Sequence, residues 1–247
     1  MRFFVNPVTL LLVLLAAFSL TDARADSWPR FRGPNGTGVA EGKDIPSQFS
    51  EGSGILWKLA LPGNGNSSPV VWDQLLFLQT AAKDAKSRSL VCIDVTGPKI
   101  VWERSVPGRP VKFRGESSHA SSTPVIDGAN VYTVFWDGDN LHLHAYTFKG
   151  EPLWNHDLGK FVSQHGPGAS PILYRDKLYF ANDMDGKSTL LCFDKKTGQK
   201  LWEKERAAFR ACYSAPYLLD GAKGQPDELI ITSTTCITSY HPESGEV

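Results

Sequence analysis

The chain has 247 residues, of which 41% are hydrophobic and 21% are charged, so it is long enough to form one large or two modest domains with apolar cores. Its 26 basic and 26 acidic side chains cancel, and no sustained basic run is present, which argues against a nucleic-acid-binding surface. The 22 glycines, 16 prolines and many aromatic residues favour short strands joined by tight turns.

The N-terminus has the layout of a secretory signal peptide. Arg2 supplies a positive start, residues 8–20 form an almost uncharged apolar run, and Ala23-Arg24-Ala25 fits a cleavage site. The apolar run is shorter than the roughly 20 residues that a membrane span needs. We therefore expect a cleavable signal peptide over 1–25, a periplasmic or secreted protein with no membrane span after cleavage, and an N-terminal extension over 26–53.

Two sequence markers recur from residue 54 onward. They return every 45–55 residues and keep the same order, which indicates internal repeats. The first marker is a small residue before proline, at Ser68-Pro69, Thr123-Pro124, Ser170-Pro171 and Ala215-Pro216. The second is a tryptophan, at Trp57, Trp102, Trp154 and Trp202.

Each repeat contains four short apolar segments separated by Asp, Gly and polar turns. In one unit these segments are 172–173, 177–180, 189–194 and 200–204. Runs of this length between turn residues are typical of half-buried strands. Four strands at this period predict an all-β protein, a β-propeller of four-stranded antiparallel blades, over residues 54–247. A β-sandwich is the rival fold, but it would not require such similar units.

The segment from Cys192 to Trp202 carries an Asp194-x-x-Thr197-Gly198-x-x-x-Trp202 pattern. This pattern resembles the tryptophan-docking repeat of PQQ-like (quinoprotein-type) propellers. The segment from Trp28 to Gly38 is similar to the start of exported PQQ-repeat proteins of planctomycete-type bacteria. The resemblance implies that Trp57, Trp102, Trp154 and Trp202 dock each blade on its neighbour. The family also includes an outer-membrane barrel-assembly propeller and PQQ-dependent dehydrogenases.

The number of blades is open at this point. About four are visible, and the last is incomplete. Either Ile55 to Leu61, with Trp57, completes the blade that starts at Ala215 and closes a four-bladed ring, or the chain is the front part of a seven- or eight-bladed ring. The second alternative is favoured because PQQ-like propellers usually have the larger number of blades.

Few residues suggest a cofactor or a metal. Asp183, Asp185 and Gly186 only loosely resemble a calcium loop, and His142 and His144 share one face of a strand without a visible third ligand. No vicinal cysteine pair is present, and we interpret all four cysteines as unpaired apolar residues. No catalytic residue or metal ligand is therefore assigned.

Fold analogy places one candidate ligand surface at the mouth of the propeller funnel, where loops precede each innermost strand. The candidate ligand-binding residues are Asn66, His119, His165, Arg210 and Tyr213. We expect a binding or scaffolding module whose partner is a small molecule or a protein. The alternatives are a PQQ-dependent oxidoreductase, which would use PQQ with calcium, and an outer-membrane protein assembly factor.

Overall fold

The computed structural model describes residues 27–34, 36–40, 46–113, 117–222 and 224–247, and the expected signal peptide lies outside them. Within these ranges the chain forms fifteen β-strands and no helix. The strands are β1 (Val70–Trp72), β2 (Leu75–Ala81), β3 (Ser87–Asp94), β4 (Lys99–Pro107), β5 (Val125–Ile126), β6 (Asn130–Trp136), β7 (Asn140–Thr147), β8 (Pro152–Lys160), β9 (Ile172–Tyr174), β10 (Lys177–Asn182), β11 (Ser188–Asp194), β12 (Lys200–Arg206), β13 (Tyr217–Leu219), β14 (Glu228–Thr232) and β15 (Ile237–Tyr240).

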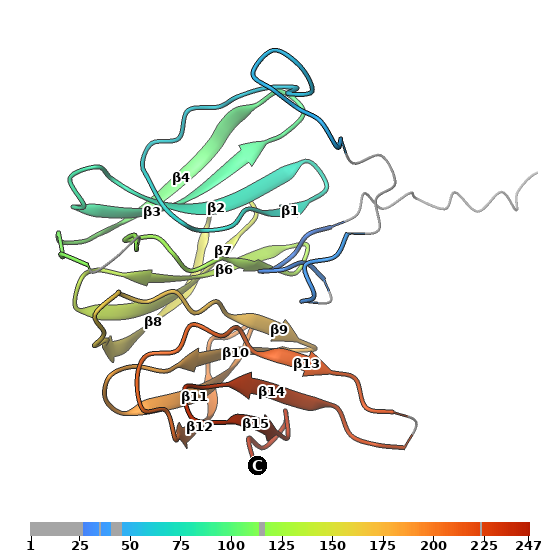
Figure 1. Ribbon diagram of the computed structural model, residues 1–247, viewed down its shortest axis with the longest axis vertical. Helices are drawn as coiled ribbons and strands as arrows, with labels where there is room; N and C mark the ends of the chain where they lie inside the picture. The colour runs from blue at the N-terminus through green and yellow to red at the C-terminus, as the bar shows by residue number, and fades with distance from the viewer. Residues whose placement is uncertain (1–26, 35, 41–45, 114–116, 223) are drawn as a thin grey trace, which may run out of the picture.

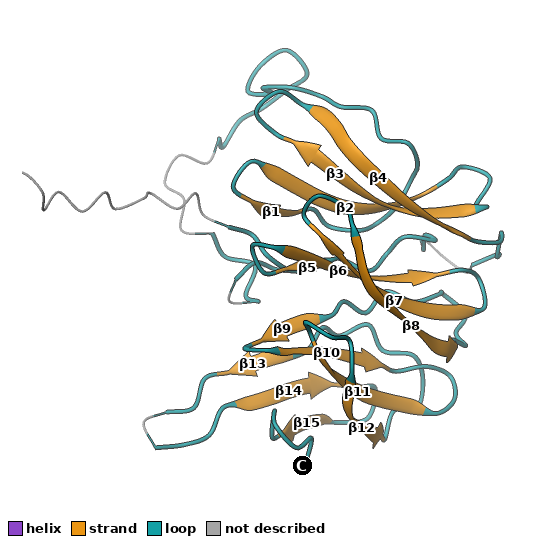
Figure 2. Ribbon diagram, turned by 180° about the vertical axis from the view of Figure 1, so that it is seen from behind, coloured by secondary structure: helices purple, strands orange, loops and turns teal. Residues whose placement is uncertain are grey.

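The strands form four antiparallel sheets that follow one another in chain order (Figures 1 and 2). Blades 1, 2 and 3 are the four-stranded sheets β1–β4, β5–β8 and β9–β12, and blade 4 is the three-stranded sheet β13–β15. The inner strand β5 contacts both β1 and β9, so the inner edges of the first three blades meet along a common hub. The predicted propeller fold is confirmed.

The core lies between the blades. One apolar cluster joins blades 1 and 2, a second joins blades 2 and 3, and a third joins blades 3 and 4. The middle strands β10 and β11 are buried almost throughout, whereas the outer strand β12 alternates between exposed and half-buried residues. The middle strands therefore read as continuous apolar runs because both of their faces are covered.

The tryptophans of the outer strands dock on the following blade. Trp102 Nε1 donates to Phe148 O at 2.8 Å, and Trp154 Nε1 donates to Lys195 O at 3.0 Å. A Cβ on Gly198 would lie 2.6 Å from the Trp154 ring, and Gly198 has a φ of 75°, so only glycine fits this turn. Trp202 packs on Gly245 in the same way, but its indole N–H has no partner among the described residues.

The recurring small residue before proline joins the blades at the hub. The Ser68 backbone N–H donates to Thr123 Oγ1 at 3.1 Å, and the Thr123 N–H donates to Ser170 Oγ at 3.0 Å. Each hydroxyl therefore accepts from the equivalent backbone of the preceding blade. The series ends at blade 4, where Ala215 has no hydroxyl.

Residues Ile55 to Leu61 do not complete blade 4. They form no strand, and β15 pairs only with β14 among the described strands. Trp57 is 38% exposed, and the space beside Gly97, where a docked tryptophan would lie, is open. The closed four-bladed ring is therefore wrong, because no described segment adds a fourth strand to blade 4. The isolated bridge between Asn64 and Ala81 instead ties the chain just after Leu61 to blade 1.

The N-terminal extension crosses the hub, which the repeat pattern does not predict. Trp28 exchanges two backbone hydrogen bonds with Val71 of β1, and Pro29 O accepts from the Ile126 N–H of β5. The chain then reaches blade 4, where a Cβ on Gly36 would lie 3.3 Å from the Tyr217 ring. In Figure 1 this blue segment lies beside the inner ends of the blades.

Candidate binding site at the hub

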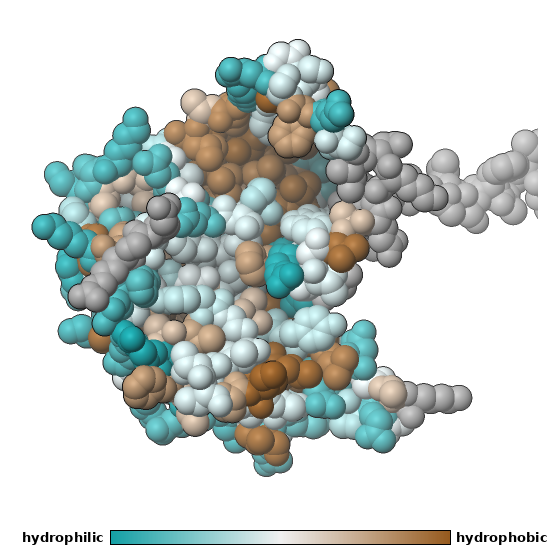
Figure 3. Space-filling view, in the orientation of Figure 1, coloured by the Kyte–Doolittle hydropathy of each residue, from teal (hydrophilic) through white to brown (hydrophobic). Residues whose placement is uncertain are grey.

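A cavity of about 280 Å³ lies between the N-terminal extension and blade 4, and we call it the hub pocket. The N-terminal extension contributes Arg30, Phe31, Arg32 and Gly36 to its lining. Blade 4 and the loop before it contribute 213–217, Ile230 and Thr232. Figure 3 shows this side of the molecule, which is hollowed beside the N-terminal segment.

Glycines shape the wall that the N-terminal extension builds. The Gly36 N–H donates to Gly33 O at 3.1 Å, and the Gly38 N–H donates to Arg32 O at 2.9 Å, so the segment curls on itself. Gly36 has a φ of 69°, and a Cβ there would collide with the Arg30 guanidinium. Glycine is required at this position because the backbone passes directly over that guanidinium.

Arg30 places a positively charged guanidinium without a described carboxylate partner in the lining of the hub pocket. The whole residue is only 9% exposed, and its Nε donates to Gly33 O at 3.2 Å. No carboxylate lies within ion-pair distance of Arg30 or Arg32 in the part of the chain that the structure describes. Burial lowers the pKa of the Arg30 guanidinium, since a desolvated cation is disfavoured.

Two tyrosines form the opposite wall. Tyr213 and Tyr217 are each 38% exposed, so both rings can contact a ligand. The Tyr213 hydroxyl lies 3.3 Å from Ser163 Oγ, and its ring packs over Gly168. The loop before β9 in blade 3 therefore orients one of the two rings.

The other sequence candidates do not gather with Tyr213 in the hub pocket. The Asn66 N–H donates to Ala120 O at 2.9 Å, which ties the loop before β1 to the loop before β5. His165 is exposed, and its N–H donates to Ser163 Oγ. Arg210 is exposed and lies 3.7 Å from Asp185 in an ion pair.

His119 orders a loop. Its Nε2 accepts from the Val111 N–H at 3.0 Å, and its ring contacts Phe113 and Trp136. Burial and then the nearby Arg88 charge lower the pKa of His119 to about 4, so the ring is neutral and can accept this hydrogen bond at neutral pH.

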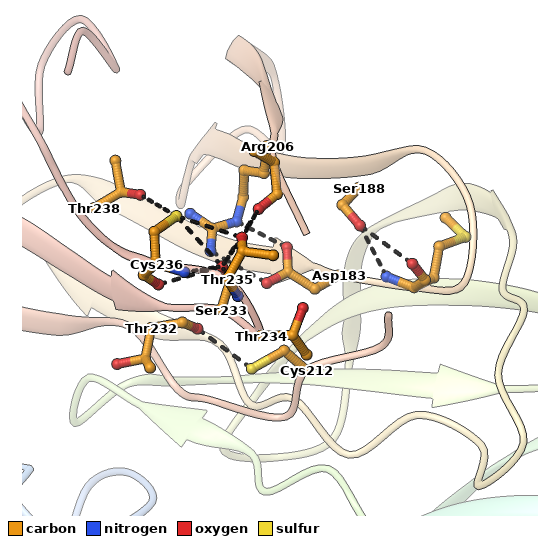
Figure 4. Close-up of polar contacts among 12 residues, drawn as sticks. Asp183, Ser188, Arg206, Cys212, Thr232, Ser233, Thr234, Thr235, Cys236 and Thr238 are labelled. Carbon is orange, nitrogen blue, oxygen red and sulfur yellow. Dashed lines mark hydrogen bonds and ion pairs between the residues drawn. The ribbon is translucent and has the colours of Figure 1, made fainter. Parts of the chain in front are cut away.

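The loosely calcium-like turn is engaged in an internal ion pair. Arg206 donates from Nε to Asp183 Oδ1 at 2.7 Å and from Nη1 to the Tyr240 hydroxyl at 2.8 Å, and both charged side chains are only 1% exposed (Figure 4). Asp183 therefore pairs with Arg206 within blade 3, and Arg206 in turn binds Tyr240 of blade 4. The residues of this turn do not fit a calcium ion.

The histidine pair on β7 has separate partners. His142 Nε2 lies 2.8 Å from Asp137 Oδ2, and His144 Nδ1 lies 3.1 Å from the Tyr146 hydroxyl. Within the described ranges, no group of three or more His, Cys, Asp or Glu side chains could hold a metal ion.

A family model described as outer membrane protein assembly factor BamB matches residues 88–218, which is more than half of the chain. The chain belongs to the PQQ-like β-propeller family. The matched range runs from β3 to β13 and includes the docked Trp102, Trp154 and Trp202. The search of curated proteins finds no significant match.

Solved structures share the fold of this PQQ-like propeller. BamB from Moraxella catarrhalis is 17% identical with a TM-score of 0.50, and the match covers 76% of this chain and 52% of that one. Quinohemoprotein alcohol dehydrogenase from Comamonas testosteroni is 19% identical with a TM-score of 0.52, and the match covers 75% and 28% respectively. This chain therefore matches about half or less of the length of either structure.

Sequence reasoning on the PQQ-like repeats missed Arg30 and Tyr217. The matched family range does not include the N-terminal extension, which carries Arg30. The repeat pattern therefore does not predict where Arg30 lies in the fold. The glycines at 33, 36 and 38 beside two arginines were the available signal.

Among the residues that the structure describes, no helix is long and apolar enough to cross a membrane.

Proposed function

We propose that this PQQ-like propeller is a binding module that holds a peptide segment of a partner protein in the hub pocket. The observation that carries the proposal is the convergence of arginines and tyrosines from separate elements on one cavity. Arg and Tyr are enriched among residues that dominate binding energy at protein interfaces. The proposed activity is binding, and no catalytic step is assigned to it.

The size of the cavity supports a peptide ligand. A volume of about 280 Å³ is at the lower limit for pockets that enclose a drug-sized molecule, and suits one or two residues of a peptide. The exposed Tyr213 and Tyr217 at its border can contact the adjoining peptide residues.

The test is a titration of the full chain with a mixed-sequence hexapeptide library, followed by amide NMR shifts. We expect saturable shifts at Gly33, Gly36 and Ala215. Thr232→Phe, at an exposed strand position in the pocket lining, should weaken binding at least tenfold by filling the cavity. Val101→Phe, at an exposed strand position on blade 1, is the matched control and should bind as the unmodified chain does.

A parallel titration with PQQ, with and without Ca²⁺, tests the oxidoreductase alternative. Saturable PQQ binding at about micromolar affinity, together with quinone-dependent dye reduction, would replace the binding-module proposal. Peptide binding that Thr232→Phe leaves unchanged would move the site away from the hub pocket.

A further inference from the structure

The unpaired charge of Arg30 bears on the chemistry of the peptide. Arg30 is only 9% exposed as a whole residue, and among the described residues the only hydrogen bond of its guanidinium goes from Nε to Gly33 O. Buried charges in proteins are normally paired, because removing a lone ion from water is strongly unfavourable. The guanidinium nitrogens other than Nε are therefore available to a ligand.

Two other buried arginines, Arg206 and Arg88, have polar partners for their guanidinium groups within the protein. Arg206 binds Asp183 and Tyr240, and the fully buried Arg88 donates to four backbone carbonyl oxygens in blades 1 and 2 and the loop between them. Arg30 has neither type of surrounding, although the exposed fraction of the whole residue, 9%, is close to the 6% of Arg206. Arg30 instead lines the hub pocket.

We infer that the hub pocket recognises a carboxylate of the bound peptide, either its C-terminus or an acidic side chain, through the guanidinium of Arg30. This inference rests on the proposed peptide-binding function. The planar guanidinium matches a carboxylate with two parallel hydrogen bonds. Arg32 lines the same cavity and adds positive potential. No described carboxylate lines the cavity to compete with the ligand.

Three hexapeptide libraries test the inference on the full chain. The first has free C-termini and no Asp or Glu, the second is amidated and contains Asp and Glu, and the third is amidated and contains neither. We expect the first or the second library to bind at least tenfold more tightly than the third, since a buried charge-assisted pair is lost in the third. The first two libraries distinguish the C-terminus from an acidic side chain.

Arg30→Met should remove the preference between libraries, and Arg30→Lys should retain only part of it because lysine lacks the guanidinium fork. Lys149→Met removes one positive charge from an exposed turn and should leave the preference intact.

Urea unfolding provides a second measurement without peptide. Removing an unpaired buried charge should leave the urea midpoint of Arg30→Met equal to that of the unmodified chain or above it, whereas a large decrease would show that Arg30 is structural.

Equal binding of all three libraries would overturn the carboxylate inference and leave the peptide-binding proposal standing. A preference that Arg30→Met and Arg30→Lys both retain would also overturn it. Failure of every library to bind would contradict both the inference and the proposed function.

Discussion

At the scale of single residues, the four cysteines show how strongly position in the blade sets chemistry. All four are unpaired, as the sequence predicts, but only Cys92 and Cys192 are buried. These two occupy the same register position, opposite Trp102 and Trp202, and burial raises the pKa of both thiols to about 12. Cys236 is exposed in the turn between β14 and β15, where hydroxyl groups surround its sulfur (Figure 4).

Cys236 should therefore react with iodoacetamide at lower pH than an ordinary thiol. Hydrogen bonds from Ser233, Thr238 and Thr235 lower the pKa of Cys236 to about 7, and the thiolate is the reactive form. In a Cys212→Ser background, the alkylation rate should rise from pH 6 to a plateau near pH 8. Ser233→Ala should move the midpoint upward, and Cys92 and Cys192 should stay unlabelled in the folded protein. A midpoint near pH 9 in the unmodified turn would contradict this account.

At the scale of elements, the two sequence markers correspond to two different contacts between blades. The tryptophans dock the outer strands on the next blade, and the Ser or Thr hydroxyls link the backbones at the hub. The tryptophan role could be inferred from its family pattern. The hydroxyl role could not, because a Ser or Thr before proline has no unique partner until the blades are placed side by side.

Thr123 provides a direct test of the hub link. Thr123→Val removes the acceptor for the Ser68 N–H while keeping the shape, and should lower the free energy of unfolding by about 1 kcal/mol. Thr123→Ser keeps the hydroxyl and should cost less. Urea unfolding monitored by tryptophan fluorescence measures both variants. Equal stability of Thr123→Val and the unmodified chain would show that this bond does not hold the blades.

At the scale of the whole molecule, the sequence predicts the blades but not the hub. The period of the markers, the Asp and Gly turns and the apolar runs set the four sheets, because each unit repeats the same pattern. Residues outside the repeats are less predictable. Ile55 to Leu61 resembles an outer strand yet forms no strand, and the extension around Arg30 crosses from β1 to blade 4.

The residues of the candidate site could likewise be predicted only in part from the sequence. Fold analogy places Tyr213 at the funnel mouth, and the structure places it in the hub pocket. Asn66 and His119 instead hold loops together through hydrogen bonds. Whether a residue contacts a ligand or a neighbouring loop depends on distances that the sequence does not contain. Arg30 becomes a candidate only when its burial and its lack of a described carboxylate partner are known.

The measurement that tests the hub-pocket proposal most directly is an isotope-filtered NOE experiment on the full chain with the tightest-binding single hexapeptide from the libraries. We expect NOEs from the peptide to the rings of Tyr213 and Tyr217 and to the Thr232 methyl group, which line the pocket from one side. NOEs confined to the outer strands β4, β8 or β12 would contradict it, because they would place the peptide on the rim of the blades, away from Arg30.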